Sequence, residues 1–335
     1  MKDWWIFRGE FDEKGKRIER LPKPPEWRRY AGTPIERQGL KEEADPRYLS
    51  DDHEREVVNA ALYLRRPLLI TGKPGTGKSS LSHAVAHELR LGELLVWPIN
   101  TRSTLLEGLY RYDAIGRLQA ASLHEARRRE KELPEEMAPQ AQNIGSFLQL
   151  GPLGTALLPS LRPRVLLIDE IDKSDIDLPN DLLHVLEKGM FEIPELARVS
   201  KGDEPIYVRT HDGGTVPIRR GQVACREFPL VVLTSNGERE FPPAFLRRCL
   251  RLELEPPTEK KLEQIVEYHF GEQFVQRAQP IIRDFLKRRT TAELATDQLL
   301  NAVYLVMNPE RPISESDLEA LKESLFQNLA GAGNP

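Results

Sequence analysis

The sequence predicts an α/β fold: a three-layer α/β/α core around a parallel sheet, with a β-hairpin insertion and a small C-terminal helical lid domain. Apolar runs at residues 67–71, 164–170 and 230–236 predict strands that are buried on both faces, as in parallel sheets. A glycine-rich loop and a helical pattern follow the first run, which is typical of a β-loop-α unit. Amphipathic helical patterns after Pro256-Pro257 predict the separate helical unit.

Residues 1–48 predict an extended arm rather than a domain. They hold three of the four tryptophans of the chain, Trp4, Trp5 and Trp27, and a proline-rich stretch at 21–26 that favours an extended backbone. The aromatic side chains need an apolar contact, and we interpret them as packing on the α/β core of their own chain. The alternative is a strap that docks a partner or an adjacent subunit.

A complete phosphate-binding pattern follows the first predicted strand. The stretch Gly72-Lys73-Pro74-Gly75-Thr76-Gly77-Lys78-Ser79 fits G-x-x-x-x-G-K-[ST] in full, ahead of a helix predicted over 79–89. Glycines let backbone N–H groups approach phosphate oxygens, and the helix N-terminus adds partial positive charge. We expect Lys78 to reach the β- and γ-phosphates and Ser79 to ligate Mg²⁺ through its hydroxyl. The predicted nucleotide-binding residues are Gly72, Lys73, Pro74, Gly75, Thr76, Gly77, Lys78, Ser79, Ser80 and Asp169.

A predicted insertion over about residues 115–148 contains a charge-dense stretch, Ser122 to Gln142, that predicts an exposed helix. The pairs Glu125/Arg129 and Arg128/Glu132 stand at the i,i+4 spacing that stabilises exposed helices. This segment is either a solvated helix face or a moving element that contacts a substrate or partner.

Polar side chains end the second and third apolar runs. Asp169 and Glu170 end the run at 164–170, and Asn236 ends the run at 230–236. Carboxyl ends of parallel strands are where ligands bind in open α/β sheets. We assign Asp169 to a direct or water-mediated Mg²⁺ contact and Glu170 to polarising the water that attacks the γ-phosphorus. Asn236 would hold that water, although asparagine before glycine is also a common turn.

The chain between these two runs is longer than one helix requires. An amphipathic pattern at 181–186 predicts a helix. Alternating apolar residues at 206–209 and 215–218 flank a turn at 211–214, and they predict a β-hairpin inside an insertion over about 190–227.

The order of these motifs resembles that of the AAA-type (AAA+) ATPases, which are P-loop NTPases. The resemblance rests on a Walker A motif at 72–79, a Walker B motif at 165–170, a sensor-1 Asn236 and an arginine-finger segment at 244–249. In that family the finger completes the active site of the neighbouring subunit in a ring. The resemblance points to Arg248 as the finger, with Arg247 as the alternative, and the catalytic set it implies is Glu170, Asn236, Arg248 and Lys78.

Two short segments are similar to the MoxR-like branch of that family: Gly151-Pro152-Leu153 and Leu105-Leu106-Glu107-Gly108. That resemblance implies ATP and Mg²⁺ as cofactors, a homo-oligomeric ring that is a hexamer, and a partner protein with a von Willebrand factor A domain. The segment Tyr110-Arg111-Tyr112-Asp113, just before the charged insertion, is a candidate lining of the pore of such a ring. The family's lid arginine, sensor 2, has no match at residues 295–300. Either Arg288, Arg289 or a neighbour's residue replaces it, or the lid is weakly coupled to hydrolysis.

The predicted domains are the arm at 1–48, an α/β nucleotide-binding core at 49–255 and a helical lid at 256–330. The lid is expected to contain four helices, at 258–270, 272–288, 296–307 and 314–329.

The composition argues against a nucleic-acid-binding protein and against a membrane protein. Lys and Arg number 48 and Asp and Glu 52, which leaves a net charge of −4, so a nucleic-acid partner is not expected. No run approaches 18 apolar residues, so no membrane span is expected. Two cysteines form no disulfide framework, which favours a cytoplasmic location.

The sequence therefore predicts a MoxR-like AAA+ ATPase that hydrolyses ATP in a ring to remodel or activate a protein client, a chaperone-like role. Two alternatives remain open. One is an AAA+ motor or loader directed by nucleic acid, because the phosphate machinery is shared. The other is a nucleotide-gated switch or scaffold with little turnover, because the sensor-2 arginine is missing.

Overall fold

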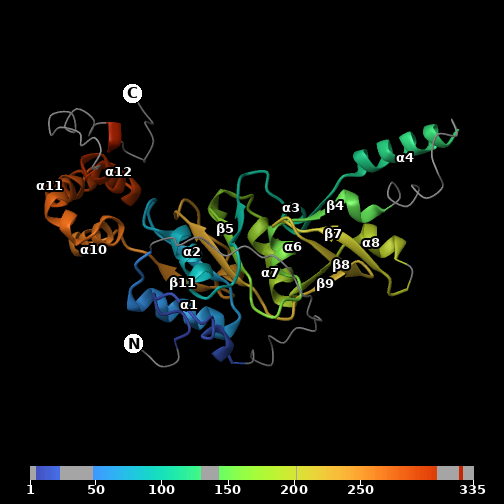
Figure 1. The fold of residues 1–335 in the computed structure, drawn as a ribbon, viewed down its shortest axis with the longest axis horizontal. Coiled ribbons are helices and arrows are strands. Elements are labelled where there is room, and N and C mark those ends of the chain that lie inside the picture. Colours follow the sequence, from blue (N-terminus) through green and yellow to red (C-terminus); the bar gives the residue numbers. More distant parts are fainter. Residues whose placement is uncertain (1–4, 23–47, 130–142, 201, 308–323, 327–335) are drawn as a thin grey trace.

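A computed structural model describes residues 5–22, 48–129, 143–200, 202–307 and 324–326 (Figure 1). In this part of the chain, five strands form a parallel sheet in the order β11-β1-β10-β5-β2. Their bounds are β1 Leu68–Thr71, β2 Leu95–Pro98, β5 Val165–Asp169, β10 Leu230–Ser235 and β11 Leu250–Glu253. Every neighbouring pair is parallel, so the carboxyl ends of all five strands lie at one edge of the sheet. This sheet confirms the predicted fold class.

Both faces of this sheet are covered. Leu69 packs in one hydrophobic core, whereas Leu68 and Ile70, which point to the opposite face, pack in another. The helices around the sheet are α1 Asp52–Leu64, α2 Lys78–Glu88, α3 Leu105–Leu109, α6 Pro152–Ala156, α7 Leu178–Lys188 and α9 Pro243–Leu246. Helix α1 begins with a capping box in which Asp51 accepts a hydrogen bond from the Glu54 N–H.

The described N-terminal residues pack on this core. Ile6 and Phe7 are each 1% exposed and join the core that covers one sheet face. The Asn59 side chain of α1 accepts hydrogen bonds from the N–H groups of Ile6 and Phe7, at 2.6 and 3.0 Å. The segment contains one short 3-10 helix, Ile18–Arg20. Trp5 is buried as expected, whereas Trp4 and Trp27 lie outside the described residues.

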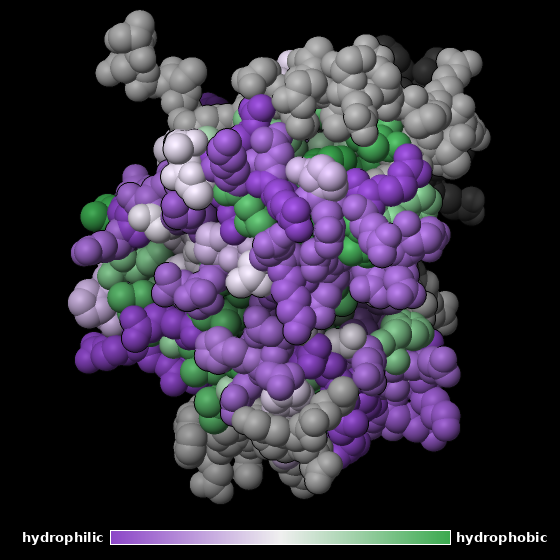
Figure 2. Space-filling view, turned by 90° about the vertical axis from the view of Figure 1, so that its left-hand side faces the viewer, coloured by the Kyte–Doolittle hydropathy of each residue, from purple (hydrophilic) through white to green (hydrophobic). Residues whose placement is uncertain are grey.

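The described C-terminal helices form a separate hydrophobic cluster (Figure 1). They are α10 Glu259–Phe270, α11 Glu272–Arg289 and α12 Thr296–Met307. Phe326 packs its ring edge-on against Phe285, while most of the fourth predicted helix lies outside the described residues. Seen from this end, the surface is mainly hydrophilic with scattered hydrophobic side chains (Figure 2). In the described part of the chain, no helix is long and apolar enough to span a membrane.

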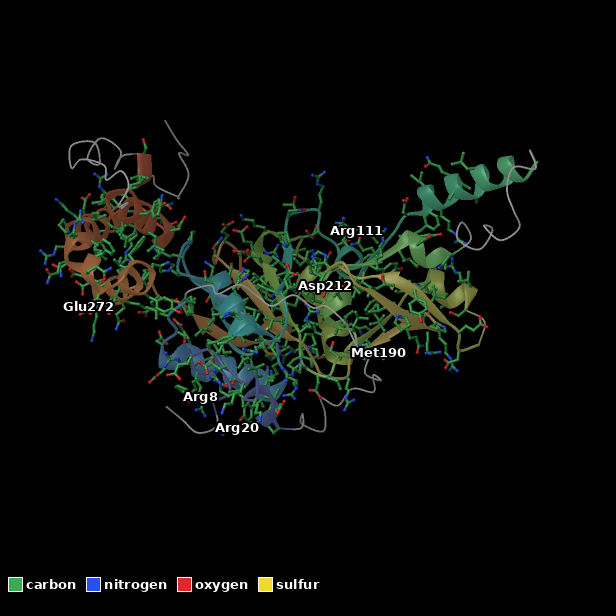
Figure 3. The ribbon with its side chains drawn as sticks, viewed as in Figure 1. Arg8, Arg20, Arg111, Met190, Asp212 and Glu272 are labelled. Carbon is green, nitrogen blue, oxygen red and sulfur yellow. The ribbon has the colours of Figure 1, made fainter. Side chains whose placement is uncertain are left out.

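A second sheet contains the predicted hairpin. Within the described residues it has six strands, in the order β3-β4-β7-β8-β9-β6. Their bounds are β3 Tyr110–Tyr112, β4 Leu148–Leu150, β6 Met190–Glu192, β7 Pro205–Arg209, β8 Thr215–Arg219 and β9 Gln222–Ala224. The 3-10 helix Ile144–Phe147 precedes β4, and α8 Pro194–Val199 follows β6, whereas the 3-10 helix Ile171–Lys173 follows β5 of the parallel sheet. Arg111 lies on one edge strand, β3, and Met190 lies on the other, β6 (Figure 3). The hairpin β7–β8 is thus the centre of a wider sheet that the sequence did not predict.

The helix of the insertion starts earlier than predicted. Helix α4, Ala114–Arg129, begins directly after β3, because the Asp113 carboxylate accepts a hydrogen bond from the Gly116 N–H at 2.7 Å. It projects from the body of the molecule (Figure 1). The side chains of the two predicted i,i+4 pairs lie outside the described residues.

The turn of the hairpin is fastened to the parallel sheet by a buried ion pair. Arg164, just before β5, donates to Asp212 in the turn at 2.9 Å, and the two side chains are 2% and 7% exposed. A second guanidinium nitrogen of Arg164 donates to the Glu93 carbonyl at 2.9 Å. Asp212 therefore holds the turn against the core, although His211, Gly213 and Gly214 beside it are exposed.

Breaking this pair should destabilise the fold. Arg164→Ala leaves a buried Asp212 carboxylate without its cation, and we expect a loss of about 3–5 kcal/mol in the free energy of unfolding, measured by urea denaturation. The control is Arg219→Ala, whose exposed pair with Asp203 should contribute less than about 1 kcal/mol. Equal losses in the two variants would show that burial does not set the strength of the Arg164 pair.

Candidate functional site

The loop between β1 and α2, which the sequence predicts to bind phosphate, requires glycine at two positions. Gly75 and Gly77 have φ of 73° and 92°, a region that other residues rarely adopt. A Cβ atom on Gly75 would lie 2.2 Å from the Cβ of Ala295, and one on Gly77 would lie 3.0 Å from the Tyr48 ring. Ser79 and Ser80 stand in the first turn of α2, whose N-terminus attracts anions.

The Lys78 ammonium lies inside this loop. Its Nζ donates to the carbonyl oxygens of Gly72 and Lys73 at 2.7 and 2.9 Å. Burial lowers the pKa of Lys78, and the carboxylates of Asp172, Asp169 and Glu170 oppose that shift. Two carbonyl oxygens of the loop therefore hold the cation against the loop backbone.

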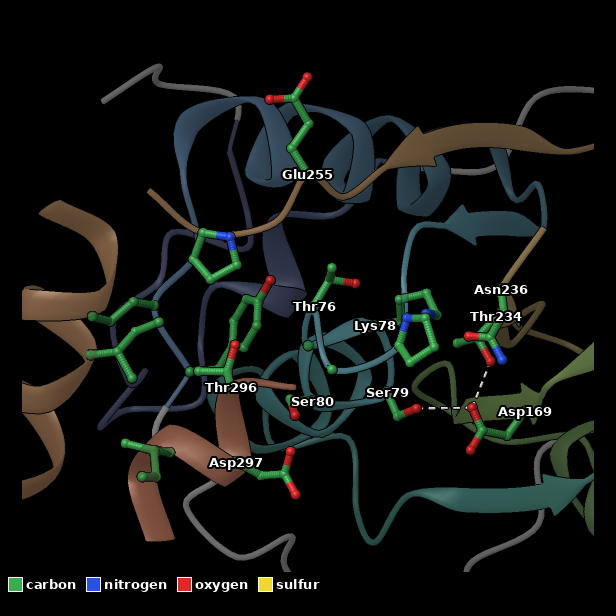
Figure 4. A pocket seen from close by; sticks show the side chains of 18 of the residues that line it. Thr76, Lys78, Ser79, Ser80, Asp169, Thr234, Asn236, Glu255, Thr296 and Asp297 are labelled. Atoms are coloured by element: carbon green, nitrogen blue, oxygen red, sulfur yellow. Dashed lines mark hydrogen bonds between the residues drawn. The ribbon is translucent and has the colours of Figure 1, made fainter. Parts of the chain in front are cut away.

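Ser79 and Asp169 meet at the carboxyl edge of the sheet. The Ser79 hydroxyl donates to Asp169 Oδ1 at 2.8 Å, and the Thr234 hydroxyl donates to the same oxygen at 2.5 Å (Figure 4). Thr234 also accepts a hydrogen bond from the Glu170 N–H at 2.9 Å, so it joins β10 to the end of β5. A hydroxyl beside a carboxylate is a donor set that suits Mg²⁺. Sequence reasoning missed Thr234 because threonine inside an apolar strand carries no motif.

Glu170 lies next to this pair, with its side chain 41% exposed. Asn236, directly after β10, places its amide nitrogen 3.5 Å from Glu170 Oε1. Lys173 donates to Glu170 Oε2 at 2.8 Å, and this hydrogen bond raises the pKa of Lys173. The structure thus brings the predicted residues Glu170 and Asn236 together. The sequence did not predict that Lys173 pairs with Glu170.

A buried carboxylate supports the loop that carries Asn236. Asp172 is 6% exposed, and its Oδ2 accepts hydrogen bonds from the backbone N–H groups of Asn236 and Glu238, at 2.9 and 3.2 Å. Arg239 in the same loop donates to the Ser174 carbonyl at 2.8 Å. The turn after β5 and the loop after β10 are therefore joined as one unit.

The pocket around these groups has a volume of about 620 Å³. One part of it is lined by apolar and aromatic side chains from the segment before α1, the linker to α10, and helices α10 and α12: Tyr48, Leu49, Pro257, Ile265, His269 and Leu300. Such a lining suits a planar heterocyclic base. No sequence signal could identify these residues, because they come from separate segments that only the fold brings together.

The start of α12 contacts the phosphate loop directly. The Thr296 N–H lies 3.4 Å from the Gly75 carbonyl oxygen, and Lys73 pairs with Glu293 at 3.5 Å. Of the two arginines expected to replace a lid cation, Arg289 lines a smaller pocket of about 200 Å³ beside the loop. Arg288 instead pairs with Asp284 of its own helix at 3.5 Å.

Arg248 does not line the pocket of its own chain. It follows α9, where its guanidinium pairs with Glu187 at the end of α7 and donates to the Ala244 carbonyl at 3.0 Å. Arg66 holds the carbonyl oxygens of Arg247 and Arg248. Within the described residues, the structure therefore brings together every predicted site residue except Arg248.

Comparison with known proteins gives one family match. The family model described as "AAA domain (dynein-related subfamily)" matches residues 67–249, which is more than half of the chain and runs from the start of β1 to just after Arg248. No curated protein matches the chain.

Proposed function

Because the chain belongs to the AAA-type ATPases, in the dynein-related subfamily, we propose that it is a Mg²⁺-dependent ATP hydrolase of the MoxR-like branch. It works in a homo-oligomeric ring, a hexamer, and uses hydrolysis to remodel or activate a protein client. The observation that carries this proposal is the Ser79–Asp169 contact beside Glu170 and Asn236, at the mouth of a complete phosphate loop.

The residues divide the chemistry between binding and hydrolysis. Backbone N–H groups of the loop and the Lys78 ammonium bind the phosphates of ATP. Ser79 and Asp169 would hold Mg²⁺, which when bound supplies positive charge to the phosphate oxygens. Glu170 accepts the proton of the attacking water, and the Asn236 amide orients that water. The exposed Glu170 carboxylate is open to the pocket, as this role requires.

Asp172 should control turnover without controlling binding. Asp172→Ala removes the acceptor for two N–H groups of the Asn236 loop. A displacement of Asn236 by about 1 Å should lower the rate of ATP hydrolysis by about 10²-fold. The affinity for ATP, measured with a fluorescent analogue, should stay the same, because the phosphate loop is intact.

The matched variant is Asp172→Asn, which keeps an acceptor oxygen of the same shape and should lose much less activity. A parallel fall of ATP affinity and turnover in Asp172→Ala would contradict the role, because it would mean that Asp172 supports the whole pocket.

The position of Arg248 supports its assignment as the finger. Arg248 lies outside the pocket of its own chain, which fits an arginine that acts on ATP bound to a neighbouring copy. The partner with a von Willebrand factor A domain is proposed from the MoxR-like resemblance alone.

The test of this function is steady-state phosphate release from ATP in Mg²⁺ buffer. We expect turnover that disappears in Lys78→Ala and on removal of the metal by a chelator. If the wild-type protein binds ATP but releases no more phosphate than Lys78→Ala, the chain is a nucleotide-gated switch instead. Hydrolysis that rises only when single-stranded DNA or RNA is added, and falls again with salt, would favour a nucleic-acid motor.

A further inference from the structure

The second sheet leaves one face open to solvent. Strand alternation sends Val208 and Val216 into the hydrophobic core. The side chains that alternate with them point outward, and those at one end of the sheet are Arg111, Gln149, Tyr207, Arg209 and Thr215. All five side chains are exposed, so no helix or loop of the described residues covers them.

Strand register places two arginines in one row across this face. Arg111 of β3 lies opposite Gln149 of β4, which in turn lies opposite Arg209 of β7. Neighbouring strands are about 4.8 Å apart, so the backbones that carry Arg111 and Arg209 are separated by about 10 Å. Tyr207 stands two residues before Arg209 on the same face and is 55% exposed.

Both arginines carry charge that the chain does not neutralise. In the described part of the chain, neither Arg111 nor Arg209 forms an ion pair. Arg219 at the end of β8 and Arg220 in the turn after it both pair with Asp203. A free guanidinium on a rigid strand is preorganised for bidentate contact with a carboxylate. The row is therefore a candidate site for an anionic partner.

We propose that the Arg111–Arg209 row binds an extended, acidic segment of a protein partner. In a polyproline-II chain, side chains three residues apart lie on the same side at a spacing of about 9 Å, which matches the separation of the two arginines. Tyr207 adds an exposed aromatic ring beside them. Single-stranded nucleic acid fits less well, because it requires a longer basic track and successive stacking rings.

This inference rests on the proposed function, in which the client is a protein. Arg111 was expected in a pore lining together with Tyr110 and Tyr112. Tyr110 is buried and donates to Glu195 at 2.9 Å, while the Tyr112 hydroxyl accepts a hydrogen bond from Arg117 at 2.9 Å. Of these three side chains, Arg111 is the one that the open face presents.

The test is fluorescence anisotropy with a labelled peptide of repeated Glu-Pro-Ser, compared with a Gln-Pro-Ser peptide of equal length and an oligothymidylate. Wild-type protein should bind the acidic peptide but neither the Gln-Pro-Ser peptide nor the oligothymidylate. The affinity for the acidic peptide should weaken as the salt concentration rises from about 50 to about 200 mM. The double variant Arg111→Glu/Arg209→Glu should lose at least about tenfold in affinity, which corresponds to about 1.4 kcal/mol. Arg251→Glu, an exposed arginine on edge strand β11 of the other sheet, should bind like the wild type.

The outcomes separate this surface from the proposed function. Peptide binding that is absent in the wild type, or unchanged in the double variant, overturns the surface. Tighter binding of oligothymidylate than of the acidic peptide, lost in the double variant, overturns the partner class. Basal ATP hydrolysis of the same samples is measured separately, so a wild-type protein that binds the peptide without hydrolysing ATP upholds the surface and contradicts the function.

Discussion

Replacing Arg248 with alanine should lower the ATP turnover of the assembled protein by about 10³- to 10⁵-fold, the range over which arginine fingers act. The expected cause is loss of the cation that one copy contributes to the transition state of its neighbour. ATP affinity should remain close to that of the wild type, because Arg248 does not line the pocket of its own chain. Turnover and affinity are measured on the same preparation.

The control for this prediction is Arg247→Ala. Arg247 is the exposed neighbour of Arg248, and it should have a much smaller effect. Mixing Arg248→Ala subunits with Lys78→Ala subunits should restore part of the turnover, because an intact finger then meets an intact pocket across some interfaces. An absence of rescue in mixed assemblies would contradict a finger that acts between copies.

The second large effect is expected for Glu170→Gln. Glutamine keeps the size of the side chain and an oxygen for the Asn236 amide, but it cannot accept the proton of water. We expect turnover to fall by about 10²- to 10⁴-fold, while ATP stays bound through the loop, Ser79 and Asp169. Rapid-quench measurement of a single turnover would separate this chemical step from product release.

A matched carboxylate at the same edge of the sheet is Glu253, at the end of β11 and outside the pocket. Glu253→Gln should hydrolyse ATP like the wild type. Turnover by Glu170→Gln that equals that of Glu253→Gln would assign the base to another group.

Local spacing was sufficient to predict a glycine loop between a buried strand and a helix. The motif at 72–79 contains both the glycines that the loop requires and the two side chains that it presents. Asp169, Glu170 and Asn236 could be grouped from the sequence because parallel strands share one carboxyl edge. The structure adds that Glu170 and Asn236 lie within 3.5 Å of each other.

Other features depend on contacts that sequence patterns do not encode. Strands β6, β9 and β3 have three residues each, so their alternation is too short to recognise, and their pairing is non-local. Thr234 and Asp172 act through hydrogen bonds between separate loops. Helix α4 begins at Ala114 because Asp113 caps it, a signal hidden beside the denser charge that follows.

The most direct measurement of the central claim is the ATP turnover per protein chain as a function of protein concentration, with assembly followed by light scattering on the same samples. If a neighbouring copy completes each site, turnover per chain rises as the chains assemble and reaches a plateau with the oligomer. Turnover that stays constant from isolated chains to full assembly would show that one chain hydrolyses ATP alone, which contradicts the account.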